Sequence, residues 1–301
     1  MNSLRISCAL LLFSGMLSAQ VPRDSSYTVE KTVEKVRKKY TELDIEGVKP
    51  SMPESVQLIP NVNYKDLGYR QLMANIFVPK ESGNHAVVLM IHGGGWRSGS
   101  PVLMRPMAEK LAEEGYIVMV PEYRLSLESR YPAAVEDIID AIKWIKKNEE
   151  KLSIDTTNIA LIGCSSGGQL ATLIGTKFPV QAVVDIDGIL AFHHPDSEEG
   201  TMAAQWLGGS YDQIPEVWKE ASALTHVSKQ TPPTLFIASK YPRFLAGHQE
   251  YMQALQVFGI KSEIRFMEDA PHSFWLLSPW FQPTLNHVIN FLNNTVLKAS
   301  Y

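Results

Sequence analysis

The residues with the clearest chemical meaning are Gly163-Cys164-Ser165-Ser166-Gly167, which follow the mainly apolar stretch 158–162 and precede a run of small, helix-forming residues. A strand, a tight turn and a helix together form the context in which Gly-x-Ser-x-Gly is a nucleophile elbow. The glycines let the chain pass closely, so that the Ser165 hydroxyl is pushed out at the carboxyl edge of a sheet. We therefore predict that Ser165 is a nucleophile. Cys164 beside it is better explained as a small buried residue of the elbow.

A serine hydroxyl is a poor nucleophile until a base takes its proton, so a histidine is required. The chain has eight histidines, and His272 follows the apparent last strand, 263–267, and precedes the final helix. When the serine follows a central strand, the loop after the last strand is where the base must come from. His248 falls on a predicted helix and His85 precedes a strand, so we predict His272 as the base.

A glycine-rich segment, His92-Gly93-Gly94-Gly95-Trp96, directly follows the apolar stretch 86–91. Glycines at this place let backbone N–H groups turn toward a developing oxyanion, and each such donor contributes roughly 3 kcal/mol to the stability of a transition state. We expect the amides of Gly93, Gly94 and Ser166 to form this oxyanion hole. Trp96 closes the loop and is a candidate substrate contact.

The spacing of apolar residues indicates how these groups are positioned. Continuous apolar runs are typical of strands covered on both faces of a parallel sheet, and they occur at 86–91, 116–120, 159–162, 182–186 and 235–238. Apolar residues three and four apart indicate helices at 132–148 and 282–297. The alternation predicts an α/β fold with a mainly parallel sheet of about eight strands, helices on both faces, and a lid or insertion at 191–230 after the sixth strand.

The N-terminal part has a different character. Residues 1–19 combine a basic start, an apolar stretch and a small residue, Ala19, before Gln20, which is typical of a cleaved export signal. We therefore expect a periplasmic or secreted protein without membrane insertion after cleavage. Residues 20–55 are predicted to be a helical extension that packs on the catalytic domain, 56–301. The net charge of -4 and pI near 6.1 give no reason to expect nucleic acid as a partner.

These motifs, with Pro121-Glu122-Tyr123-Arg124-Leu125 and Tyr131-Pro132-Ala133-Ala134, make the chain resemble the α/β-hydrolase superfamily over roughly residues 60 to 298. It looks closest to the esterase branch that includes acetyl, feruloyl and related carbohydrate esterases. The resemblance implies the α/β-hydrolase fold and a two-step acyl transfer through an acyl-enzyme on Ser165. We expect no cofactor and no metal, because no carboxylate or cysteine spacing supports His193-His194 as ligands.

The acid of the triad is where the chain departs from the family. Its usual loop here reads Ser239-Lys240-Tyr241-Pro242-Arg243-Phe244 and contains no Asp or Glu. Asp187, at the end of the preceding apolar strand, is the favoured replacement. Asp269, Asp196 and Glu250 stay open, as does an enzyme that works with a dyad or is inactive.

Arg243 occupies the loop that lacks the acid, and a guanidinium at the rim of the site would suit a substrate that carries a carboxylate. Together with Trp275 near the base, it is similar to features of pectin-acting esterases from polysaccharide-degrading bacteria. We therefore expect hydrolysis of methyl or acetyl esters, or of feruloyl esters, on plant polysaccharide, with pectin favoured. A peptidase of the prolyl-oligopeptidase type and a non-catalytic binding protein are the alternatives; the sequence does not indicate an oligomeric state.

Overall fold

A computed structural model describes residues 21–198 and 200–297. The predicted export signal, 1–19, lies outside the described residues. Eight strands form a single sheet in the order β1-β2-β4-β3-β5-β6-β7-β8, in which β3 to β8 run parallel and β1 and β2 pair antiparallel with their neighbours. The strands are β1 (Val56–Asp66), β2 (Gln71–Pro79), β3 (His85–Ile91), β4 (Ile117–Pro121), β5 (Ile154–Cys164), β6 (Ala182–Ile186), β7 (Thr234–Ala238) and β8 (Ser262–Phe266). This confirms the predicted fold class.

The central strands are buried along almost their whole length, as their continuous apolar runs predicted. β1 was not predicted as a strand, because its residues alternate irregularly between exposed and partly buried positions. It lies at one edge of the sheet, where a strand needs only one apolar face. The opposite edge is β8, whose residues are also only partly buried or exposed.

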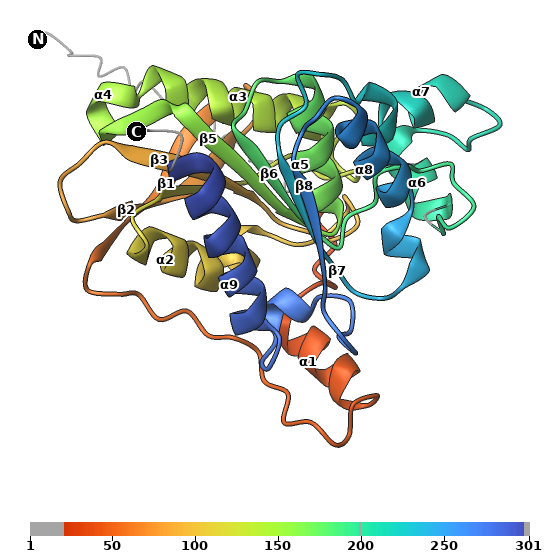
Figure 1. The fold of residues 1–301 in the computed structure, drawn as a ribbon, viewed down its shortest axis with the longest axis horizontal. Coiled ribbons are helices and arrows are strands. Elements are labelled where there is room, and N and C mark those ends of the chain that lie inside the picture. Colours follow the sequence, from red (N-terminus) through yellow and green to blue (C-terminus); the bar gives the residue numbers. More distant parts are fainter. Residues whose placement is uncertain (1–20, 199, 298–301) are drawn as a thin grey trace, which may run out of the picture.

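Helices cover both faces of the sheet (Figure 1). One core contains buried side chains of α3 (Ala133–Lys147), α5 (Ser166–Lys177) and α8 (His248–Val257), and the other contains those of α2 (Arg105–Glu113) and α9 (Phe281–Leu292). The short helix α4 (Glu149–Leu152) connects α3 to β5. The long connection after β6 carries α6 (Gly200–Leu207) and α7 (Pro215–Glu220), whose Trp206 and Trp218 join the first core. Among the described residues, no helix is long and apolar enough to cross a membrane.

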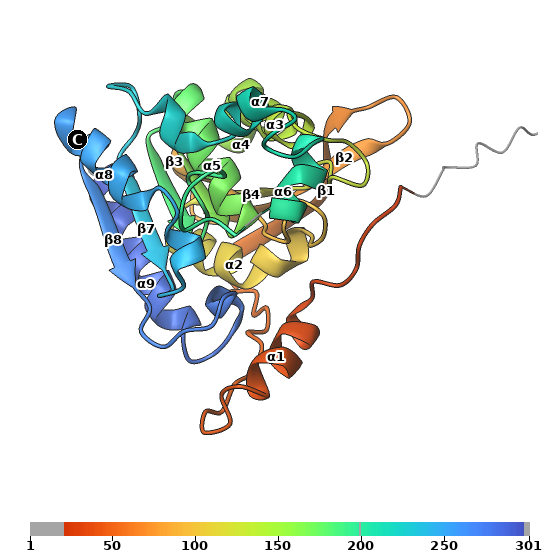
Figure 2. The same ribbon diagram turned by 90° about the vertical axis from the view of Figure 1, so that its right-hand side faces the viewer.

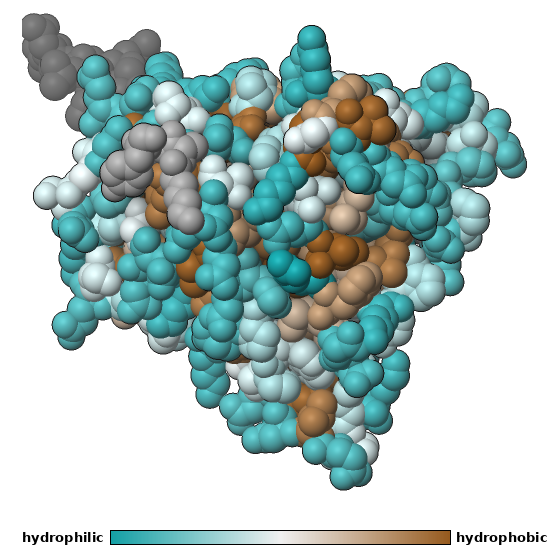
Figure 3. Space-filling view, in the orientation of Figure 1, coloured by the Kyte–Doolittle hydropathy of each residue, from teal (hydrophilic) through white to brown (hydrophobic). Residues whose placement is uncertain are grey.

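The N-terminal segment contains helix α1 (Val29–Arg37), which begins at the capping residue Thr28. In the two ribbon views α1 projects from the body and lies beside the loop that joins β8 to α9 (Figures 1 and 2). Figure 3 shows that this projecting end is mostly hydrophilic on the visible face. The segment is nevertheless anchored, because Ile45 is fully buried and Gly47 forms a backbone bridge with Leu277.

Candidate active site

Ser165 lies at the turn between β5 and α5, at the carboxyl edge of the sheet. Its backbone has φ 54° and ψ -123°, a strained conformation that a serine adopts at a nucleophile elbow. A Cβ on Gly163 would lie 1.9 Å from the Gly167 carbonyl oxygen, and one on Gly167 would lie 2.2 Å from the Ile91 carbonyl oxygen. Both contacts are with backbone that cannot move aside, so the elbow requires glycine at both positions. The Gly-x-Ser-x-Gly pattern is therefore dictated by close packing.

The loop after β8 brings His272 to the serine, with 3.0 Å between His272 Nε2 and Ser165 Oγ. The imidazole is held between two aromatic rings: Phe244 stacks on it with ring centroids 3.8 Å apart, and Trp275 meets it edge-on at 5.2 Å. These contacts fix the plane of the ring. His272 can take the proton of the Ser165 hydroxyl without a rearrangement.

Asp187 completes the line of hydrogen bonds. Its Oδ2 accepts a hydrogen bond from His272 Nδ1 at 2.7 Å, and its side chain is fully buried. Asp187 directly follows β6, and its left-handed backbone, φ 57°, turns the chain out of the strand. Ser239, at the end of the neighbouring β7, donates its backbone N–H to Asp187 Oδ1 at 2.7 Å and its hydroxyl to the same carboxylate. The loop that usually supplies the acid thus supplies hydrogen-bond donors to it.

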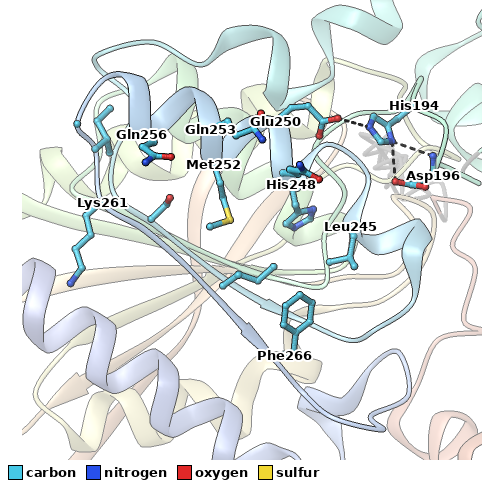
Figure 4. A pocket seen from close by; sticks show the side chains of 15 residues that line it. His194, Asp196, Leu245, His248, Glu250, Met252, Gln253, Gln256, Lys261 and Phe266 are labelled. Carbon is cyan, nitrogen blue, oxygen red and sulfur yellow. Dashed lines mark hydrogen bonds and ion pairs between the residues drawn. The ribbon is translucent and has the colours of Figure 1, made fainter.

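The other three candidate acids lie elsewhere. Asp196 and Glu250 flank His194, at 3.6 Å and 3.2 Å from its ring nitrogens. They belong to a separate pocket between α8 and β8, which Figure 4 shows with both carboxylates directed at His194. Asp269 is exposed on the loop that carries His272. His193, which was considered with His194 as a metal ligand, instead stacks on Tyr211.

The glycine-rich loop after β3 faces Ser165, although its three glycines have different roles. Gly94 and Gly95 line the cleft, with φ of 133° and 60°. Gly93 lies behind the nucleophile, where a Cβ would come within 2.6 Å of the Cys164 carbonyl oxygen. The Ser166 amide belongs to the first turn of α5, so it has no partner within the helix. Gly94 and Ser166, two of the three predicted oxyanion donors, line the cleft together with Ser165, and so does Gly95, which was not predicted.

A buried layer supports this loop. His92 Nδ1 donates to the Gly93 carbonyl at 2.9 Å, and the Tyr123 hydroxyl donates to the His92 carbonyl at 2.8 Å while the two rings stack. Complete burial lowers the pKa of His92 to about 4, so this imidazole is neutral at pH 7. His92 thus contributes a hydrogen bond that shapes the loop and no charge.

The three predicted substrate contacts have different environments. Arg243 lines the cleft, with its guanidinium 4.7 Å from the Phe244 ring and 3.9 Å from a Glu198 carboxylate oxygen. Trp96 also borders the cleft, but it is only 2% exposed, stacks on Trp206 and donates its indole N–H to Gln169. A buried ring has little free face for a sugar.

Trp275 is not where a substrate contact was expected. It is 3% exposed and is absent from the residues that line the cleft. Its edge-on contact with the His272 ring places it behind the imidazole. We therefore correct its assignment: Trp275 supports the base.

The cleft over the triad has a volume of about 830 Å³. One wall comes from the N-terminal extension, which the sequence reasoning had placed on the domain but not at the site. Tyr27 borders the cleft, and its hydroxyl lies 3.0 Å from Ser273 Oγ, beside the base. In the part of the chain that the structure describes, no group of three or more His, Cys, Asp or Glu side chains is arranged to hold a metal ion.

Comparison with known proteins places this site in a family. Residues 74–249 match the family model BD-FAE. The chain is 28% identical to Esterase LipC of Mycobacterium tuberculosis, over 69% of this chain and 58% of that protein. It is 36% identical to an ethyl acetate hydrolase of Pseudomonas putida, over 63% of this chain and 66% of that protein. It thus spans less than two thirds of the length of these curated relatives.

Solved structures share the fold. A truncated carbohydrate esterase from gut microbiota superposes with a TM-score of 0.69 at 20% identity, covering 83% of this chain and 99% of that one. A bifunctional GH43-CE protein of Bacteroides eggerthii superposes with a TM-score of 0.67 at 22% identity, covering 79% of this chain and 38% of the other. The family match covers more than half of the chain, from within β2 to the start of α8. The chain therefore belongs to the BD-FAE family of α/β-hydrolase-fold esterases.

Proposed function

We propose that this protein is a serine carboxylic-ester hydrolase. The observation that carries the proposal is the continuous line of short contacts from Asp187 through His272 to Ser165, at the edge of a cleft lined by Gly94, Gly95 and Ser166. It is the arrangement that acyl transfer requires: a nucleophile, a base, and a group that orients the base.

The chemistry follows from this geometry. Ser165 Oγ attacks the ester carbonyl carbon while His272 Nε2 takes its proton, and the carbonyl oxygen becomes an oxyanion that the Gly94 and Ser166 amides stabilise. Collapse of this intermediate breaks the bond to the alcohol, which receives the proton from His272. Water then attacks the acyl-enzyme, again giving a proton to His272, and the acid leaves as Ser165 regains its proton. Asp187 stabilises the imidazolium in both steps.

The completed triad also bears on the alternative of a non-catalytic binding protein, which was motivated by a missing acid. Asp187, which directly follows β6, supports an active triad, because it lies 2.7 Å from His272 Nδ1 and accepts a hydrogen bond from the Ser239 amide. A non-catalytic binding protein would not require a buried carboxylate that is hydrogen-bonded to the histidine.

For the substrate we propose methyl or acetyl esters on an acidic plant polysaccharide, with pectin preferred, reached by a protein exported through its N-terminal signal. Arg243 supports an acidic substrate, since its guanidinium borders the cleft and lies on Phe244, which in turn stacks on His272. The gut-microbiota neighbour is named a carbohydrate esterase, which supports the carbohydrate part of this proposal.

Two measurements test the activity itself. A fluorophosphonate should label the wild type, and Ser165→Ala should abolish both labelling and the hydrolysis of p-nitrophenyl acetate. Cys164→Ala is the matched control: it should stay labelled, because burial raises the pKa of the Cys164 thiol and keeps this neighbouring nucleophile protonated. Absence of labelling in the wild type would overturn the proposal.

The substrate is tested separately, by the release of methanol and acetate from pectin and of acetate from neutral acetylated xylan. We expect pectin to be preferred and Arg243→Gln to reduce that preference. Equal rates on the two polymers would refute the assignment to an acidic substrate while leaving the esterase intact.

A further inference from the structure

Helix α1 forms one wall of the catalytic cleft and turns a row of lysines toward it. Lys31, Lys35 and Lys39 all line the cleft, and all three are exposed. Residues four apart lie on one face of a helix, about 6 Å apart along its axis. The helix ends at Arg37 and is capped by Lys38, so Lys39 lies in the turn directly after the cap. We call these three residues the α1 lysine row.

The row is held in place by its neighbours. Thr32 and Val36, on the adjoining face of α1, are buried against the body of the protein. Lys31 Nζ donates to the Ser25 carbonyl at 3.3 Å, and Lys39 Nζ donates to the Tyr241 hydroxyl at 2.9 Å. The row therefore runs along the cleft toward the loop that carries Arg243.

The α1 lysine row forms no ion pair with the part of the chain that the structure describes. Within residues 21–198 and 200–297, no carboxylate lies within 4.0 Å of Lys31, Lys35 or Lys39. The acids of the helix lie outside the cleft, and Glu34 pairs with Lys38 at 2.8 Å, which also does not line it. A solvent-exposed row of cations at the catalytic opening is notable in a chain whose net charge is -4.

The described lining of the cleft is cationic as a whole. Its basic residues are the α1 lysine row and Arg243, while its acidic residues are Glu198 and the buried Asp187, which is hydrogen-bonded to His272. Clefts lined by charges of one sign raise the local concentration of ligands of the opposite sign. Repeated charges along one wall suit a ligand with repeated negative charges.

We propose that the α1 lysine row is a binding subsite for the carboxylates of a uronate polymer whose ester is held at Ser165. The inference rests on the proposed ester hydrolysis and makes the substrate more specific: a polyanionic chain that continues beyond the reacting sugar along α1. A single free uronate would reach Arg243 but would leave most of the row unoccupied.

Binding gives the most direct test, because it does not depend on turnover. In the Ser165→Ala protein, demethylated polygalacturonate is titrated by calorimetry with the row intact and with K31Q/K35Q/K39Q added. Three exposed ion pairs of ordinary strength together account for about a tenfold change in affinity. We expect that loss, together with a weaker dependence of affinity on salt concentration. Unchanged affinity in the triple variant would overturn the proposal, and so would equally tight binding of dextran sulfate, because it would show no preference for a uronate chain.

Kinetics on the active protein separate this inference from the proposed function. The ratio of kcat/KM for partially methyl-esterified polygalacturonate, which keeps free carboxylates beside its esters, to that for p-nitrophenyl acetate should fall about tenfold in K31Q/K35Q/K39Q. Lys38→Gln is the matched control, since it removes a charge from the same helix outside the cleft, and its ratio should stay within about twofold of the wild type. An unchanged ratio in the triple variant of an active esterase refutes the lysine subsite alone. A wild type that hydrolyses neither substrate refutes the proposed function.

Discussion

The carboxylate that orients the base comes from the strand before the usual one, and Asp187→Asn tests whether it is the functional acid. The substitution keeps the shape but removes the charge that faces His272 Nδ1 at 2.7 Å in a fully buried position. Unit charges about 4 Å apart attract by roughly 4 kcal/mol at an effective dielectric constant near 20, which corresponds to a factor of about 10³. An amide also offers an N–H to Nδ1 and so favours the wrong tautomer, which extends the expected loss in kcat to about 10⁴-fold.

The assay is the hydrolysis of p-nitrophenyl acetate, with kcat and KM measured separately. Asp269→Asn is the matched control on the loop of the base, and it should change kcat by no more than about twofold, as an exposed substitution. Ser239→Ala should give an intermediate loss of roughly tenfold, because it removes one hydrogen bond to the charged carboxylate. An Asp187→Asn variant that keeps more than about a tenth of the wild-type kcat would refute the reasoning, as would an equal loss in Asp269→Asn.

Further predictions concern the loops and the buried histidines. Gly93→Ala should abolish labelling by a fluorophosphonate, because its Cβ would displace the backbone before the nucleophile; normal labelling would contradict this. Tyr27→Phe removes a hydrogen bond to the loop of the base. It should raise the activation free energy by roughly 1 kcal/mol and so lower kcat several-fold in the same ester assay. Burial lowers the pKa of His92 and of His248 to about 4 from 6.5. Between pH 6.5 and pH 4 the unfolded chain therefore binds more protons than the folded protein, so the stability of the fold decreases as the pH falls through this range. The pKa of buried Asp185, raised to about 7, acts in the opposite direction. We therefore expect that, between pH 7 and pH 5, the free energy of unfolding measured with urea falls by about 2 kcal/mol less in His248→Asn than in the wild type. Equal decreases in the two proteins would refute this account.

The strands and helices that position the site could be predicted because burial on both faces leaves a strong pattern. β3, β4, β6 and β7 are mainly apolar runs, and α3 shows a single apolar stripe. The edge strand β1 could not be predicted, since an edge position does not require a regular pattern of burial. Glycine spacing likewise predicts the elbow, because close backbone contacts allow no other residue.

The acid was harder to identify for a geometric reason. Sequence places a carboxylate after a strand but does not say how far its side chain is from a histidine in a distant loop. The sequence favoured Asp187 but left Asp269 open. The structure distinguishes them, because β6 and β7 are neighbours, Ser239 lies beside Asp187, and Asp187 contacts His272. A polar residue in the vacated loop, able to donate to the displaced acid, is a signal that could have been used.

The contacts of the N-terminal extension with the site could not be predicted from its apolar spacing. Its apolar spacing predicts that α1 packs on the domain, but the functional surface is the other face, where lysines at i, i+4 and i+8 look like an ordinary solvated face. The structure shows that this segment touches three loops around the site: Asp24 pairs with Arg97, directly after the glycine-rich segment, Tyr27 contacts the loop of the base, and Lys39 contacts the loop after β7. A segment that borders the cleft and ties its loops together should influence both substrate preference and the geometry of the triad. Substitutions in the extension should therefore separate into two groups: charge changes that alter KM for acidic polymers, and changes at the anchoring contacts that alter kcat for every ester.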